Sequence, residues 1–171
     1  MYNIKELKKK EEGLRKECKT HFESFFSAMD YTNLSGTEVS YFDVSMLVDL
    51  KKLKDQPGVY LILTDYKKAE NVCSLEVNGL KVIYRGHGVR LRKRVESHLF
   101  NKAYNNNKGG TDYKDCIKLD GGNGINIDEI PYKKHRWVVI EHRMAYSSKL
   151  IREQAEKAYD SLYFLPIGCK R

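Results

Sequence analysis

Two strand-forming segments in the middle of the chain constrain its fold most strongly. Val59–Thr64 is rich in β-forming residues and continuous enough to be buried, and it follows a break at Pro57-Gly58. Leu80–Tyr84 is the next such segment, and Asn78-Gly79 before it is typical of a hairpin turn, with residues 74–78 as a short ancillary strand. These segments predict a buried antiparallel pair.

Helical patterns follow this pair along the chain. After an expected loop at residues 86–88, the residues from Val89 onward repeat Leu91, Val95 and Leu99 on one helical face. An irregular stretch at residues 101–131 precedes a third strand at 136–141. A last helix, residues 149–162, can be capped by Ser147 or Ser148. This order predicts an α+β domain, with a small antiparallel or mixed central sheet flanked by helices.

The first 56 residues are expected to form an N-terminal helical extension to a core at residues 57–171. Ile4–Met29 has helical charge spacing, solvated in its first half, while its second half places phenylalanines on one side. Asp43 is a plausible N-cap for a second, short helix ending at Lys54. A long basic helix can also lie along DNA, although a solvated face is the commoner explanation.

The charge balance favours a polyanionic partner. Lys and Arg total 31 against 23 Asp and Glu, which leaves a formal net charge of +8. The four cysteines lack the close spacing of zinc sites, so free thiols in a reducing cytosol are expected. The sequence has neither an apolar signal segment nor a membrane-spanning stretch, and we expect a cytoplasmic protein without a membrane partner.

A cluster of basic residues follows the second strand within ten positions of Tyr84. Its members are His87, Arg90, Arg92, Lys93 and Arg94. On a helix Arg90, Arg94 and His98 recur every four residues and therefore share a face. The planar guanidinium group suits phosphate binding, although an ordinary solvated basic face has the same pattern.

Five features occur in a fixed order along the chain. Gly58-Val59-Tyr60 opens the first strand, and Tyr84-Arg85-Gly86 closes the next, 24 residues on. Arg94 follows Tyr84 by ten residues, His98 follows Arg94 by four, and a late helix carries Arg152-Glu-Gln-Ala155. Over about residues 58–166 this combination resembles the GIY-YIG nuclease family. Each tripeptide is short, and the resemblance depends on their order and strand placement together with the downstream residues.

The resemblance implies a phosphodiester-hydrolysing site. Tyr60 and Tyr84 would line it, and Tyr60 more than Tyr84 would accept or relay the proton of the attacking water. A free phenol has a pKa of about 10, so a cation such as Arg94 or a metal ion must favour the phenolate. Arg94 would hold the scissile phosphate and stabilise the transition state. The alternative is that both tyrosines are core aromatics and Arg94 an ordinary surface residue.

Two further residues take roles from the same resemblance. His98 would hydrogen-bond the tyrosine or the phosphate, or relay a proton, whereas its alternative is a partly buried histidine on the helix face. Glu153 matches the metal-binding glutamate and would hold Mg²⁺, with Mn²⁺ as a substitute, beside the substrate phosphate. Glu156 competes with it, unless it pairs with Arg152 or Lys149 on the helix surface.

Three residues near the second tripeptide are expected to contact substrate phosphate: His87, Arg90 and Arg92. His87 stands where many members of the family carry Lys or Arg, so its charge would depend on pH. An asparagine often found after the glutamate helix is also missing from residues 164–168. Neither departure removes a core catalytic group of the family.

The architecture favours a compact, sequence-specific enzyme similar to type II restriction endonucleases, acting on double-stranded DNA. The N-terminal helix and an insertion at about residues 101–135 would contact that DNA. Cleavage of both strands favours a homodimer or two sequential encounters. The alternatives are a non-catalytic nucleic-acid-binding module, an RNA nuclease, or a structure-specific or homing-type nuclease of the same fold.

Overall fold

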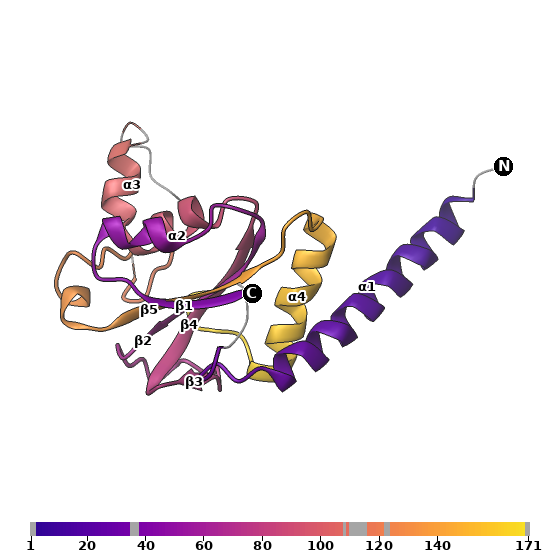
Figure 1. The fold of residues 1–171 in the computed structure, drawn as a ribbon, viewed down its shortest axis with the longest axis horizontal. Helices are drawn as coiled ribbons and strands as arrows, with labels where there is room; N and C mark the ends of the chain where they lie inside the picture. The colour runs from indigo at the N-terminus through magenta and orange to yellow at the C-terminus, as the bar shows by residue number, and fades with distance from the viewer. Residues whose placement is uncertain (1–2, 35–37, 108, 110–115, 122–123, 170–171) are drawn as a thin grey trace.

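The two strand signals at the centre of the sequence become the centre of an antiparallel sheet. The computed structural model describes residues 3–34, 38–107, 109, 116–121 and 124–169 (Figure 1). Five strands pair in the order β1-β5-β2-β4-β3. Their bounds are β1 Val39–Asp43, β2 Gly58–Thr64, β3 Glu76–Val77, β4 Leu80–Gly88 and β5 Trp137–Arg143. The predicted α+β class is therefore confirmed, and the sheet in the described residues is antiparallel throughout.

Helices cover both faces of this sheet (Figure 1). The α-helices are α1 Ile4–Ala28, α2 Leu91–Leu99, α3 Asn101–Asn107 and α4 Lys149–Tyr163, and the 3₁₀ turns are η1 Leu47–Lys52 and η2 Tyr132–Lys134. Alternate residues of β2 pack in two different clusters, because successive side chains of a strand point to opposite faces. Tyr60 and Ile62 face α2. Val59, Leu61 and Leu63 face α1 and α4.

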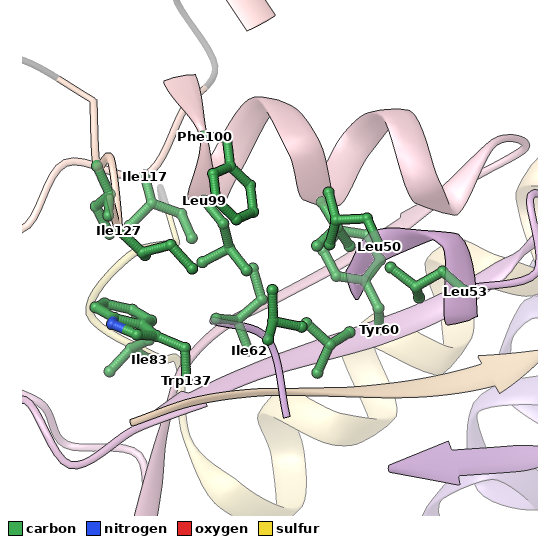
Figure 2. Close-up of a cluster of buried hydrophobic side chains, with 14 of the residues drawn as sticks. Leu50, Leu53, Tyr60, Ile62, Ile83, Leu99, Phe100, Ile117, Ile127 and Trp137 are labelled. Atoms are coloured by element: carbon green, nitrogen blue, oxygen red, sulfur yellow. The ribbon is translucent and has the colours of Figure 1, made fainter. Parts of the chain in front are cut away.

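The cluster on the α2 side contains most of the large buried side chains (Figure 2). Leu91, Val95 and Leu99 of α2 meet Tyr60 and Ile62 of β2, as the helical spacing predicts. Residues from the predicted insertion join the same cluster, namely Ile117, Leu119, Ile125 and Ile127. This part of the insertion therefore belongs to the core, and the irregular stretch also contains the unexpected helix α3.

The cluster on the α4 side joins α1 to the sheet. Phe26 is 1% exposed and packs with Tyr159 of α4, at 5.9 Å between ring centroids. Ser148 caps α4, accepting a hydrogen bond from the backbone N–H of Ile151, as expected. No helix in the described residues combines the length and the apolar character needed to cross a membrane.

The prediction of a purely helical extension over residues 1–56 is wrong. Residues 39–43 form β1, which pairs with β5, because its β-forming residues find an open sheet edge. Asp43 does not cap a helix; its carboxylate accepts hydrogen bonds from Arg136. The expected helix at residues 43–54 is limited to η1, whose Leu50 joins the α2-side cluster.

The prediction of a loop at residues 86–88 is wrong. These residues continue β4, because backbone pairing with β2 extends to Gly58↔Gly88. The hairpin turn before β4 is confirmed, with φ of 52° at Asn78 and 76° at Gly79. The four cysteines form no disulfide among the described residues.

Candidate active site

Tyr60, Tyr84 and His98 lie together on the α2 side of the sheet, although they come from three different elements. The Tyr84 and His98 ring centroids are 4.2 Å apart, and Tyr60 is 5.9 Å from Tyr84 and 6.0 Å from His98. Tyr60 is fully buried, and Tyr84 is half-buried. The structure thus brings both tripeptide tyrosines and the helix histidine into one aromatic group.

Gly86 explains how the Tyr60 ring reaches this position. Tyr60 is paired with Gly86 across β2 and β4. A Cβ atom at Gly86 would lie 2.6 Å from the Tyr60 hydroxyl oxygen and 2.8 Å from Tyr84 Cε1. Only glycine leaves room for both rings there. The glycine of the second tripeptide therefore has a direct steric role in placing the two tyrosines.

Arg94 is the cation of this group. It lies on α2, one turn before His98, and a Cβ atom at Gly88 would be 3.1 Å from Arg94 Cγ. Burial raises the pKa of Tyr60 well above its ordinary value, and it raises that of Tyr84 to about 12, whereas the Arg94 charge lowers both. Arg94 is therefore placed to oppose the cost of a phenolate, but burial dominates in this state.

The Tyr60 hydroxyl is a buried polar group without a well-formed hydrogen bond in the part of the chain that the structure describes. The Tyr84 hydroxyl and the Arg94 guanidinium are near enough to influence its pKa, but their geometry is not that of a regular bond. A buried hydroxyl in this condition gains from any ligand that supplies a partner.

His98 is more deeply buried than the sequence suggests. Its side chain is 0% exposed, and burial, assisted by the Arg94 charge, lowers its pKa to about 3. The imidazole is thus neutral at physiological pH, which disfavours a role as a proton relay through the charged form. Neither ring nitrogen has a hydrogen-bond partner among the described residues. Contact with the two tyrosine rings is its observed role.

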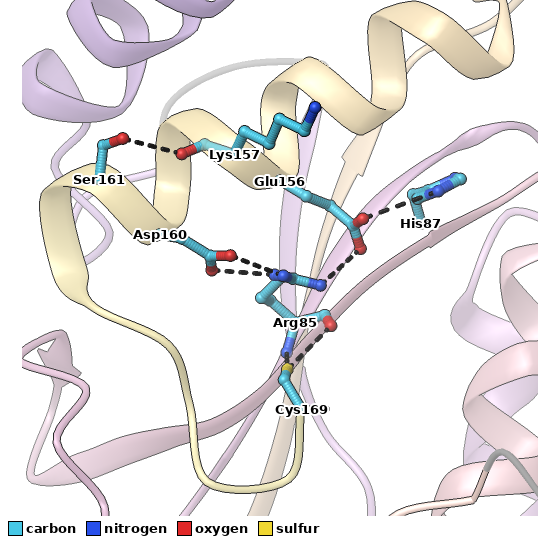
Figure 3. A network of polar contacts seen from close by, with 7 residues as sticks. All are labelled: Arg85, His87, Glu156, Lys157, Asp160, Ser161 and Cys169. Carbon is cyan, nitrogen blue, oxygen red and sulfur yellow. Dashed lines mark hydrogen bonds and ion pairs between the residues drawn. The ribbon is translucent and has the colours of Figure 1, made fainter. Parts of the chain in front are cut away.

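β4 also presents side chains to the opposite face, where Arg85 and His87 meet α4 (Figure 3). Arg85 donates to both carboxylate oxygens of Asp160, at 3.0 and 2.6 Å, and to Glu156 at 3.1 Å. The other Glu156 oxygen lies 3.7 Å from His87 Nε2. Arg85 and Asp160 are not among the predicted site residues. Glu156 pairs with Arg85 and His87 of β4 and not with the expected partners Arg152 and Lys149.

His87 lies between the charges of the two faces. Burial lowers its pKa most strongly, and the positive charges of Arg152, Lys149 and Arg94 act in the same direction, while Glu153 opposes them. Its Nδ1 is buried and has no hydrogen-bond partner in the described residues. A neutral imidazole can still donate one hydrogen bond, although it carries no positive charge.

Glu153 is the more accessible of the two candidate carboxylates. Its side chain is 33% exposed and lies 3.6 Å from Lys149 Nζ and 3.7 Å from Arg15 Nη1. Among the described residues, no group of three or more His, Cys, Asp or Glu side chains is arranged to hold a metal ion. One accessible carboxylate nevertheless fits Mg²⁺, which commonly takes one or two carboxylates and completes its shell with water and phosphate oxygens.

Arg90 and Arg92, the other predicted phosphate ligands, have protein partners. Arg90 is the N-cap residue of α2, so it does not belong to the helical face that was predicted to hold Arg90, Arg94 and His98. Its guanidinium donates hydrogen bonds to Asp55 at 3.1 Å. Arg92 donates to the backbone carbonyl of Leu53 at 2.8 Å and so fastens the end of η1 to α2. In this state both guanidinium groups hold the surrounding loop.

The arrangement has two parts that share β4. Tyr60, Tyr84, His98 and Arg94 form the group on the α2 face, and His87 connects it electrostatically to the carboxylates of α4. Comparisons of the chain with protein-family models, with curated proteins and with solved structures found no match.

Proposed function

We propose that this protein is a metal-dependent DNA endonuclease of the GIY-YIG type. One observation carries the proposal: Tyr60, Tyr84, Arg94 and His98, which the sequence pattern selects from separate segments, are adjacent in space. The aromatic rings are within 6.0 Å of one another. Arg94 acts on both tyrosine hydroxyl groups. The positive guanidinium of Arg94 suits a phosphodiester, and a phenol beside it can take part in proton transfer during hydrolysis.

Arg94 binds the scissile phosphate in this proposal and stabilises the added negative charge of the transition state. Tyr60 accepts the proton of the attacking water. Its burial makes the phenol a weak acid, so the positive charge of Arg94 beside the hydroxyl is required for the proton transfer. Neutral His98 packs against both rings and fixes their orientation, while His87 donates to a phosphate oxygen from the neighbouring position.

Glu153 is the residue that would hold the metal ion in this proposal. A bound Mg²⁺ supplies neutralisation of the charge that develops on the leaving oxygen, and Mn²⁺ can substitute. Lys149 and Arg15 contact Glu153 only at 3.6–3.7 Å, so its carboxylate is not committed to a tight ion pair. Glu156 is engaged by Arg85 and His87 and is less suited to the task.

The substrate proposed is double-stranded DNA cut at specific sequences, as in restriction-type members of the family. The net charge of +8 supports a nucleic-acid substrate. A non-catalytic binding module would share this charge, but it would have no need for the complete set of Tyr60, Tyr84, Arg94 and Glu153. We therefore propose a nuclease and treat binding without cleavage as the alternative outcome.

The test is cleavage of plasmid and phage DNA by purified protein with Mg²⁺. Tyr60→Phe removes only the hydroxyl and is expected to reduce the rate by about 10²–10⁴-fold, the usual contribution of a general base. Glu153→Ala is expected to bind DNA without cutting it. Tyr159→Phe is the matched control, because Tyr159 is equally buried but lies in the cluster on the α4 side.

Each outcome has a defined meaning. Discrete bands support sequence-specific cleavage, and a smear indicates a nuclease without specificity. If wild-type protein binds DNA but leaves it intact with both Mg²⁺ and Mn²⁺, the binding-module alternative replaces the proposal. Cleavage retained by Glu153→Ala removes the assignment of Glu153 as metal ligand.

A further inference from the structure

The N-terminal half of α1 extends away from the rest of the protein (Figure 1). All residues from 3 to 14 are exposed, including the apolar Ile4 and Leu7. The C-terminal half is fixed instead, since Phe26 is buried and its carbonyl accepts a hydrogen bond from Tyr163 at 2.8 Å. An isolated helical segment of this length is marginal in water, so a partner that contacts it would add stability.

Charges are distributed unevenly around this projecting helix. At 3.6 residues per turn, five lysines fall within a sector of about 100°. These residues, named the lysine flank below, are Lys5, Lys8, Lys9, Lys16 and Lys19. Glu12 lies among them, while Glu6 and Glu17 lie on the opposite side. Within the part of the chain that the structure describes, Lys19 pairs with Glu23, and the other four make no ion pair.

The lysine flank lies on the same helix as Arg15, which contacts the proposed metal ligand. Arg15 Nη1 lies 3.7 Å from Glu153, the proposed metal ligand, and the helix continues outward from that contact to Lys5. Ten residues of helix span about 15 Å. A duplex rises by about 3.4 Å per base pair, so this length corresponds to roughly four base pairs. A duplex that is bound at Glu153 and follows α1 would therefore run beside these lysines for about that length.

We infer that the lysine flank is an arm that binds the phosphate backbone of duplex DNA next to the cleaved bond. This inference rests on the proposed function and assigns the arm its partner by charge complementarity. A second copy of the chain is less suited to this surface. Its exposed apolar positions Ile4, Leu7 and Leu14 are interrupted by Glu11, and parallel pairing would bring like charges of Lys10 and Arg15 together.

The experiment compares two triple variants in the full-length protein. In the arm variant, Lys5, Lys9 and Lys16 become Gln, which preserves helix propensity. In the control, Lys51, Lys67 and Lys157 become Gln; these exposed residues lie outside α1 and outside the insertion at residues 101–135. Binding of a 30-base-pair duplex is measured in EDTA over a series of KCl concentrations, and cleavage is measured with Mg²⁺.

The arm variant is expected to bind at least tenfold more weakly at low salt. The slope of log affinity against log salt should decrease by about 2–3, because each lost phosphate contact contributes about 0.9. The control should retain the wild-type affinity and slope to a much greater extent. Circular dichroism establishes that both variants keep the wild-type helix content.

The experiment distinguishes a failure of the arm inference from a failure of the proposed function. If wild-type protein binds and cuts DNA but the two triple variants behave alike, the arm inference is wrong and the proposed function stands. If wild-type protein neither binds nor cuts, both are wrong. If Leu7→Gln with Leu14→Gln dissociates a dimer in sedimentation analysis while the arm variant binds DNA normally, the helix serves a second copy of the chain instead.

Discussion

Glu156 illustrates how burial and charge compete at one carboxyl group. Its side chain is 15% exposed, and burial is the largest influence on it, raising its pKa to about 7. Arg85 lowers that pKa, whereas the neighbouring charge of Asp160 raises it. Arg85 is divided between the two carboxylates, so it cannot offset the desolvation of both fully. The group therefore changes its protonation near neutral pH.

This pKa predicts a pH-dependent stability. The folded value is above the ordinary value of 4.5, so the stabilising contribution is full below pH 4.5 and is lost as pH rises through 7. Relative to Glu156→Gln, wild-type protein should lose about 1–3 kcal/mol of unfolding free energy between pH 4.5 and 8. Urea unfolding across this range measures the difference.

Glu12→Gln provides the control for that measurement, because Glu12 is exposed on α1. Its stability curve should run parallel to that of wild-type protein. A parallel curve for Glu156→Gln as well would show that the carboxyl of Glu156 titrates at its ordinary pKa, and the proposed competition between burial and Arg85 would be wrong.

At the scale of elements, α1 is held by its last turns. Phe26 is 1% exposed and contacts His142 and Tyr159, with ring centroids at 5.4 and 5.9 Å. Phe25, its neighbour in sequence, is 41% exposed. The two phenylalanines thus offer the same side chain in two environments within one helix.

Phe26→Ala is expected to destabilise the protein by about 3–5 kcal/mol, as is usual for a buried phenylalanine. Phe25→Ala should cost about 1 kcal/mol, because much of its surface is already in water. Chemical denaturation of both variants measures the two values. Equal losses would mean that α1 is anchored by its surface as a whole and not by the contact of Phe26 with α4.

The sequence predicted the elements whose pattern is local and strong. β2, β4, α2 and α4 follow from apolar periodicity, and the hairpin at Asn78-Gly79 from its turn residues. β1 was missed because its strand character depends on pairing with β5, about 100 residues away. Gly86 and Gly88 suggest a loop by propensity, but pairing with β2 keeps them in the strand.

In the candidate site too, only the contacts that follow from local sequence patterns were predictable. The proximity of Tyr60, Tyr84 and His98 was predictable, because strand register and helical spacing set it. The pairing of Arg85 with Glu156 was not, since these residues are 71 positions apart and no local pattern connects them. An arginine in a strand with apolar neighbours is the available signal, because such a charge requires a partner from elsewhere.

For the molecule as a whole, β2 joins two cores that the sheet separates. All seven of its residues are buried, and its alternate side chains enter the two clusters. The insertion between α2 and β5 is tied to the α2-side cluster by Ile117 and Ile125 and by a bridge between Phe100 and Asn126. Asp120 adds polar anchors, accepting from Tyr66, Lys68 and Tyr132.

These ties predict that the described residues of the insertion unfold together with the sheet. The Ile125 N–H donates to the Ile117 carbonyl at 3.0 Å and the Ile127 N–H to the Leu99 carbonyl at 2.8 Å. Both side chains are at most 2% exposed. In native-state hydrogen exchange, their amides should show opening free energies within about 1 kcal/mol of those of β2.

The exposed part of α1 provides the contrast in the same experiment. Amides of residues 8–12 have no tertiary contact to protect them in the described structure, so they should exchange by local fraying. Fast exchange at Ile125 and Ile127 would instead mean that the insertion opens locally, as the exposed part of α1 does. The core beside Tyr60 would then open independently of the sheet, and the ring positions of the candidate site would depend on that local equilibrium.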